Sequence, residues 1–283
     1  DAQTMEQVFR LLEQRFLQKP GEKVSAEEQT KRLAKAWAGN ASADNLTEAF
    51  ISLDKALTYK NSVMPRVSSS YWGLNARYIN RPLVINPRRL SENEEDYFLP
   101  YLFNVSKEEA RMDYTDIHGG HGTIPAGAIK TYIGMIRKSY LALEKTRPEA
   151  PQKEFLRKMA ISLRIHASIM RSCGNFAAAQ VIREKNAESL NGPPHRPDKL
   201  SSWTGHPDII PFNDIMRDEL DNAVELIAIL KNGGLEVFCH AVDHAHEDTF
   251  LAGPDIVEQI QKKRKIMLDH WLDIEEYLSS PFK

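Results

Sequence analysis

Cysteine is scarce in this chain of 283 residues, which contains only Cys173 and Cys239. Neither belongs to a Cys-x-x-Cys pair, so the sequence excludes a four-thiolate zinc site and a framework of several disulfides. Two thiols in a chain of this size are typical of a reducing compartment, although two cysteines could still form one bridge. We therefore expect a cytoplasmic protein.

Long apolar runs and a strong net charge are also missing. No apolar run approaches the roughly 20 residues that a membrane-spanning helix needs. Residues 1–19 carry charges throughout, unlike a secretory signal. The formal net charge of −2 gives no basis for sequence-independent binding to nucleic acid. We expect a soluble protein with neither a membrane-spanning segment nor a nucleic-acid partner.

Signatures of covalent catalysis are absent as well. The sequence has no Gly-x-Ser-x-Gly elbow and no His-Glu-x-x-His motif. The glycine-rich run at residues 118–127 lacks the spacing of a phosphate-binding loop and follows no predicted strand. His166 lies on an apolar helical face, which is typical of a core histidine. We find no convincing nucleophile or acid–base pair.

What the sequence does contain is helix signals, which predict an all-α multi-helix bundle. Residues 4–19 carry an apolar stripe with helical spacing, and Ser25 and Glu28 form a capping box for a helix that ends near Gly39. These elements and a third helix form a predicted N-terminal helical subdomain over residues 1–62.

Residues 63–125 break this rhythm and are interpreted as an ordered connecting segment. The segment is rich in proline and aromatic residues and ends in the Gly/His loop. It also contains a possible short strand at Leu83–Ile85 and two capping boxes, formed by Ser91 with Glu94 and by Ser106 with Glu109.

The remaining residues, 126–283, form the predicted C-terminal helical domain. A helix starting near Gln152 is expected to break at Gly174, with Asn175 capping the next helix. The run Lys262–Lys265 lies in the last predicted helix, which reaches Ser279, and is interpreted as a solvated face.

A long helical hairpin is predicted inside this domain. Asn213 is expected to cap its first arm, which reaches Leu230, and Gly233-Gly234 provides the turn. The second arm is predicted over residues 235–247, antiparallel to the first because the connection is short.

Histidines gather on the second arm of this hairpin. In a helix, His240 and His244 would share a face at the i, i+4 spacing of helical zinc ligands, with Asp243 beside them. His118 and His121 of the Gly/His loop are candidates for further ligands. The alternative is that these histidines simply line an exposed helix.

Three segments resemble, in order, the catalytic domain of Ras-type guanine nucleotide exchange factors. LRIHASIMRSCGNFAAAQVIREKNAESLN is similar to that family's helix–Asn-Asn-Phe–helix stretch, with Gly174 in place of the first Asn. Lys199-Leu200-Ser201-Ser202-Trp203 is similar to the segment leading into the family's hairpin. QKKRKIMLDHWLDIEEYLSSPFK resembles the closing helix.

The resemblance implies binding of a Ras-superfamily small GTPase and promotion of GDP release without covalent chemistry or a cofactor. The hairpin would act as a wedge beside the nucleotide. The resemblance implies that Asn175 and Phe176 help to form the surface that docks the GTPase, with Trp203 as a further contact. The acids Asp218, Glu219 and Glu225 would compete with phosphate.

Two other functions stay open. The runner-up is a metal-dependent all-α hydrolase that uses a divalent metal such as zinc on His240, Asp243 and His244, with His118 or His121. The third is a helical scaffold or interaction module without catalysis.

Overall fold

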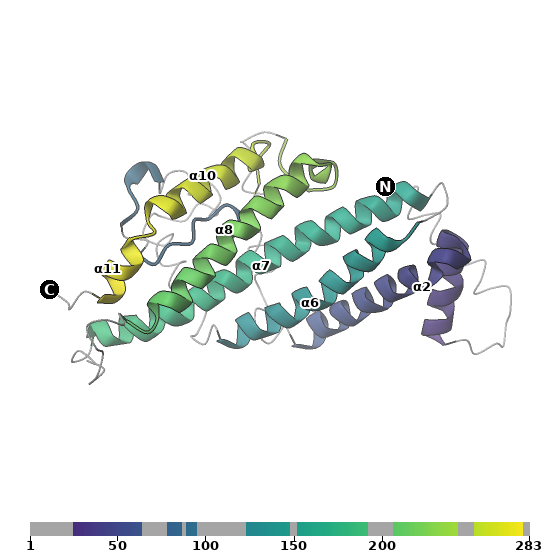
Figure 1. Ribbon diagram of the computed structural model, residues 1–283, viewed down its shortest axis with the longest axis horizontal. Helices are drawn as coiled ribbons and strands as arrows, with labels where there is room; N and C mark the ends of the chain where they lie inside the picture. The colour runs from purple at the N-terminus through teal and green to yellow at the C-terminus, as the bar shows by residue number, and fades with distance from the viewer. Residues whose placement is uncertain are drawn as a thin grey trace. The chain divides into compact units, whose positions relative to one another are not determined.

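The structure is a computed structural model, and its described residues form helices and connecting segments but no strand (Figure 1). The prediction of an all-α multi-helix fold is confirmed. The structure describes residues 25–63, 78–86, 89–94, 123–147, 152–191, 206–242 and 252–279. Among these, no helix has the length and apolarity that crossing a membrane requires.

Helix α2 (Ala26–Val63) is two helices joined at a kink. It begins as predicted, because the Ser25 hydroxyl accepts a hydrogen bond of 3.2 Å from the Glu28 backbone N–H. At Gly39 the backbone has φ 66° and ψ 174°, a conformation that favours glycine. The predicted helix end near Gly39 is therefore confirmed: the first helix stops there, and a second helix continues in a different direction.

The described residues divide into two compact units, each built from separate stretches of chain. Of the described residues, the first unit combines residues 25–56 with those of Met135–Leu163. Trp37 lies in its core, in edge-to-face contact with Phe50 and Phe155 at centroid distances of 6.0 and 5.7 Å. Helix α6 (Thr123–Lys145) joins α2 in this unit through the Ser139 hydroxyl, which donates to the Ala49 carbonyl at 2.8 Å.

The second unit contains the C-terminal helices. They are the later part of α7 (Gln152–Asn191), α8 (Ile209–Lys231), the 3-10 turn η4 (Gly234–Glu236), α10 (Ile256–Asp269) and α11 (Asp273–Ser279). Apolar side chains of α7, α8, α10 and α11 share one core, which includes Phe176, Phe212, Met216, Met267 and Ile274. Helices α2, α6 and α7 contribute residues to both units.

The predicted strand at Leu83–Ile85 is wrong. These residues are buried in the core of the second unit, and no strand lies beside them in the part of the chain that the structure describes. The buried guanidinium of Arg183 donates to the carbonyls of Val84 and Ile85, at 3.1 Å for Ile85. A side chain thus satisfies backbone groups that a neighbouring strand would otherwise satisfy.

Two predicted helix boundaries are also wrong. Helix α7 runs unbroken through Gly174, so Asn175 caps nothing there. Gly174 instead permits a close approach to α6, because a Cβ at this position would lie 3.2 Å from Cγ2 of Ile129. Helix α8 starts at Ile209, four residues before Asn213, with Pro211 in its first turn, where proline is tolerated.

The predicted second arm of the hairpin is wrong for the residues that the structure describes: apart from the short 3-10 turn η4, they form no helix up to Val242. After the η4 turn the chain continues without helix through residues 237–242, and Ala241 N–H donates to the Ala252 carbonyl at 2.7 Å. The rest of the predicted arm lies outside the described residues. The predicted closing helix is divided at His270–Leu272 into α10 and α11.

Candidate functional site: a buried polar network beneath an exposed helix face

A buried ion pair joins α8 to α10 in the second unit. Glu219 and Lys263 are 0% and 1% exposed, and the ammonium group of Lys263 donates to the Glu219 carboxylate. Lys263 also donates to the Tyr78 carbonyl at 2.8 Å and lies 5.9 Å from the centroid of the Phe176 ring. Burial lowers the pKa of Lys263, and the Glu219 charge acts in the opposite direction.

Neutral polar groups of α7 and α8 complete the solvation of this pair. Ser172 donates to Glu219 at 2.6 Å, and Asn175 donates to its other oxygen at 2.8 Å. Asn222 donates to the Ser172 hydroxyl at 3.0 Å and to the Ser168 carbonyl at 2.9 Å. We call Ser172, Asn175, Glu219, Asn222 and Lys263 the polar network. It replaces the water that both charges lose on burial.

The sequence carried a signal for this network that the initial interpretation missed. Glu219 occupies the apolar stripe of α8, between Met216 and Ala223. Lys263 occupies the equivalent stripe of α10, between Ile260 and Met267. An acid and a base, each at a core position of its own helix, indicate a buried pair. The interpretation of the whole Lys262–Lys265 run as a solvated face is therefore wrong at Lys263.

A second ionic cluster lies beside the network. Arg171 of α7 donates to both oxygens of Asp218, at 2.7 and 2.9 Å, and to Glu225 at 3.1 Å. Asn175 contributes a further hydrogen bond to Asp218, at 2.9 Å. Burial would raise the pKa of Asp218, but the bonds from Arg171 and Asn175 and the charge of Arg171 lower it below its usual value.

The opposite side of α8 is exposed. Successive turns of the helix contribute one residue each to a stripe with helical spacing, which we call the exposed α8 face. Its members are Ile210, Asp214, Arg217, Asp221, Val224, Ala228 and Lys231. Ile210 and Val224 are 69% and 46% exposed, which is high for large aliphatic side chains. The face thus combines apolar contact area with charges of both signs.

Two glycines end α8, each for its own reason. Gly233 has φ 94°, in the left-handed region that favours glycine. At Gly234, a Cβ would lie 2.6 Å from the carbonyl oxygen of Ile229. The predicted turn at these two residues is confirmed, and Leu235 and Glu236 lie exposed directly after it.

The residues implied as GTPase contacts occupy different environments. Phe176 and Glu219 are buried at 2% and 0% exposure, so neither presents a side chain at the surface. Asn175 is half-buried in the polar network, and Asp218 and Glu225 are held by Arg171. Trp203 lies outside the described residues.

The candidate metal ligands are not brought together within the described part of the chain. His240 lies in a non-helical segment, so the helical spacing assumed for it does not apply there. Its Nδ1 donates to the Ala241 carbonyl at 2.8 Å, which leaves Nε2 as the acceptor in the neutral ring. Asp243, His244, His118 and His121 lie outside the described residues. No group of three metal-ligating side chains occurs among those described.

His166 is half-buried and hydrogen-bonded within its helix pair. Its Nε2 lies 2.9 Å from the Tyr132 hydroxyl, and the two rings are in edge-to-face contact. Burial, with a smaller contribution from the charge of Lys60, lowers the pKa of His166 to about 4. The ring is therefore neutral at physiological pH.

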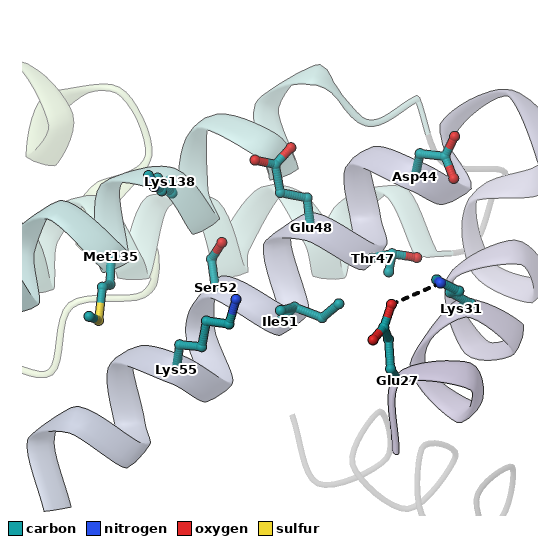
Figure 2. A pocket seen from close by; sticks show the side chains of 10 residues that line it. All are labelled: Glu27, Lys31, Asp44, Thr47, Glu48, Ile51, Ser52, Lys55, Met135 and Lys138. Carbon is teal, nitrogen blue, oxygen red and sulfur yellow. Dashed lines mark ion pairs between the residues drawn. The ribbon is translucent and has the colours of Figure 1, made fainter. Parts of the chain in front are cut away.

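An open groove lies in the first unit, between the two parts of α2 and α6 (Figure 2). Its volume is about 450 Å³, and Thr47, Ile51 and Met135 are among the less exposed residues of its lining. Charged side chains of both signs surround it, and Lys31 pairs with Glu27 at 2.8 Å. Such a mixed and exposed lining is typical of a solvated surface between helices.

Comparison with models of known protein families, with curated proteins and with solved structures finds no match.

Proposed function

We propose that this protein binds a Ras-superfamily small GTPase through the exposed α8 face and promotes the release of GDP. Two things support the proposal: the ordered resemblance to exchange factors, and one structural observation, which carries it. Helix α8 presents an exposed stripe along its 23 residues, whereas its opposite face is anchored in the core by the polar network.

An exchange factor needs no covalent chemistry. It has to bind the nucleotide-free GTPase more tightly than the loaded form, and this difference in affinity shifts the equilibrium towards release. A rigid helix suits this role, since a surface that is ordered before binding loses little conformational entropy.

The structure changes the roles that we propose for Asp218, Glu219 and Glu225. Glu219 supports α8 from inside. Asp218 and Glu225 are already paired with Arg171, so a cation of the partner would meet carboxylates whose charge is partly compensated. Asp221 is exposed and forms no ion pair within the described residues, so it becomes the first acid to test beside Val224.

The test is release of fluorescent GDP from a panel of small GTPases at micromolar protein. We expect at least one member to release nucleotide faster with the wild-type chain. Val224→Asp should reduce that acceleration by about tenfold, which corresponds to roughly 1.4 kcal/mol of lost contact energy. The matched control is Leu141→Asp, which alters an aliphatic residue of similar exposure in the first unit.

Three outcomes separate the alternatives. If no GTPase responds, the exchange proposal fails. If one binds without faster release, the chain is an interaction module. If Leu141→Asp and Val224→Asp reduce the rate equally, the contact is not made by the exposed α8 face.

A metal-dependent hydrolase is the second candidate, and the hydrogen bond of His240 favours it. An Nδ1–H donated to a backbone carbonyl is the usual way in which proteins orient a histidine whose Nε2 binds a metal. The test is the metal content of metal-replete protein after desalting. Zinc retained by the wild type and lost in His240→Ala would support this candidate, and metal-free protein would contradict it.

A further inference from the structure

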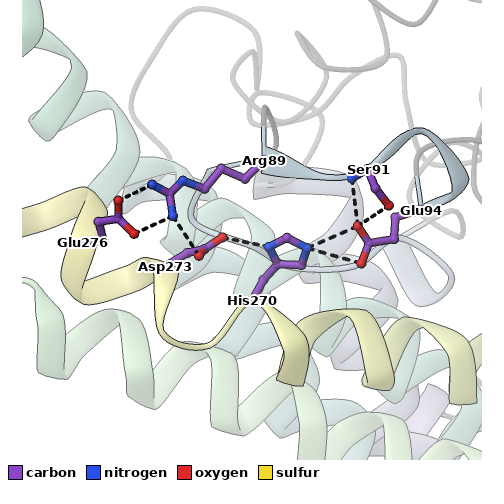
Figure 3. Close-up of polar contacts among 6 residues, drawn as sticks. All are labelled: Arg89, Ser91, Glu94, His270, Asp273 and Glu276. Carbon is purple, nitrogen blue, oxygen red and sulfur yellow. Dashed lines mark hydrogen bonds and ion pairs between the residues drawn. The ribbon is translucent and has the colours of Figure 1, made fainter.

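The junction between α10 and α11 holds a polar cluster that the proposed function does not use (Figure 3). His270 ends α10, and its side chain is 13% exposed. The stretch at residues 89–94 packs against this junction and contributes Arg89, Ser91 and Glu94. The cluster thus links segments that are far apart in the sequence.

His270 lies between two carboxylates, one on each side of its ring. Nδ1 is 2.7 Å from an oxygen of Asp273, and Nε2 is 3.3 Å from both oxygens of Glu94 (Figure 3). Because a carboxylate only accepts hydrogen bonds, both contacts are hydrogen bonds only when both ring nitrogens carry a proton. The arrangement therefore fits the charged imidazolium.

Charged side chains of α10, α11 and residues 89–94 surround His270. Arg89 donates to Asp273 at 3.0 Å and to both oxygens of Glu276, at 2.6 Å for the longer of the two bonds. Glu94 also accepts from the Ser91 backbone N–H at 2.8 Å and from its hydroxyl at 2.7 Å. Lys265 of α10 is exposed and paired with Asp269. With His270 charged, two cations face the three carboxylates of this cluster.

We propose that His270 makes the contact of Glu94 with the α10–α11 junction dependent on pH, holding Glu94 when protonated and releasing it when neutral, while Arg89 stays bonded to α11. In the neutral ring the remaining proton belongs on Nδ1, where the bond to Asp273 is shorter. The lone pair of Nε2 then faces the Glu94 carboxylate, which is a repulsive contact. Glu94 keeps its bonds to Ser91, so it can leave His270 without losing its own partners.

The direction of the pH dependence follows from the electrostatics. Burial would lower the pKa of His270, but its hydrogen bonds to Asp273 and Glu94, with the charges of both, raise it above its usual value. Burial likewise opposes ionisation of Glu94, yet its bonds to Ser91 and His270 lower the pKa of Glu94. The contact is thus complete below the pKa of an unfolded histidine, and is lost as the pH rises through the folded pKa of His270.

Two measurements on the full chain test the proposal together. The first follows the imidazole C–H signal of His270 by NMR between pH 5 and 9. The second measures hydrogen–deuterium exchange of backbone amides in residues 89–94 over the same range, corrected for the intrinsic pH dependence of exchange. We expect protection to fall about tenfold for each unit by which the His270 pKa of the wild type exceeds that of Glu94→Gln, because only the part of the shift that Glu94 causes is linked to its release.

Variants separate the proposed cause from general loosening. Glu94→Gln should abolish the pH step, because an amide can accept from the protonated ring and donate to the neutral one. His270→Gln removes the titration itself and should also abolish the step. His206→Gln, in the stretch before α8, should retain it. A His270 pKa at or below 6.5, or a pH step that persists in Glu94→Gln, would overturn the proposal.

Discussion

The fully buried pair of Glu219 and Lys263 is best understood as a constraint on how α8 and α10 meet. Removing two charges from water costs several kcal/mol each, so such a pair contributes little net stability by itself. Either charge alone in this core would be far worse. Packings of α8 and α10 that separate the two residues are therefore penalised, while the observed packing satisfies both through Ser172, Asn175 and the Tyr78 carbonyl.

The first prediction concerns Lys263→Met. The substitution leaves the Glu219 carboxylate buried without a countercharge and should lower the free energy of unfolding by about 3–5 kcal/mol. Adding Glu219→Gln removes the stranded charge and keeps one of the two acceptor oxygens that Ser172 and Asn175 use, so the double variant should recover part of the loss. Urea denaturation measures both.

Lys262→Met is the control, because Lys262 precedes Lys263 but is exposed. Its denaturation midpoint should stay close to that of the wild type. A double variant no more stable than Lys263→Met alone would contradict the assignment of a charge pair.

At the scale of elements, glycine has different roles in α6, α7 and after α8. Gly134 and Gly174 both lie inside helices, where glycine is unfavourable compared with alanine. Gly134 has no atom within 4 Å of its missing Cβ, whereas Gly174 faces Ile129. Sequence alone predicts a break at Gly174, because it does not show whether a glycine ends a helix or allows another helix to pack closely. It correctly predicts the end of α8 at Gly233-Gly234, where the left-handed backbone of Gly233 ends the helix.

The second prediction uses this contrast. Gly134→Ala should stabilise the protein by about 0.5–1 kcal/mol through helix propensity alone. Gly174→Ala gains the same propensity but pushes its Cβ against Ile129, so its net effect should be smaller. Gly174→Leu should be destabilising by about 1–3 kcal/mol through overpacking. Thermal unfolding followed by circular dichroism measures the series, and equal stabilisation by both alanine variants would contradict the close approach.

At the scale of the whole molecule, the helical content was easier to predict than the division of the chain into two compact units. The Ser25–Glu28 capping box predicted the start of α2, and the Gly233-Gly234 turn predicted the end of α8, because these signals are local. The two compact units are not local, since each joins stretches that are distant in the sequence. The segment at Leu83–Ile85 shows the same limit, because the side chain that bonds its carbonyls is Arg183, about a hundred residues away on α7. The polar network was missed for the same reason, because it joins residues of three helices that are distant in the sequence.

The last prediction tests whether the first unit has a core of its own. Trp37 is 5% exposed between Phe50 and Phe155, so Trp37→Ala should destabilise this unit by about 3–5 kcal/mol, the usual result of truncating a buried tryptophan. Because local opening follows cooperative units, hydrogen exchange should accelerate in residues 40–56, 135–147 and 152–163 while α8 and α10 keep their protection. Leu141→Ala, at an exposed position of the same unit, should leave exchange unchanged in both regions. Equal loss of protection in α8 would mean that the two cores open as a single cooperative unit, held together by the helices that contribute to both.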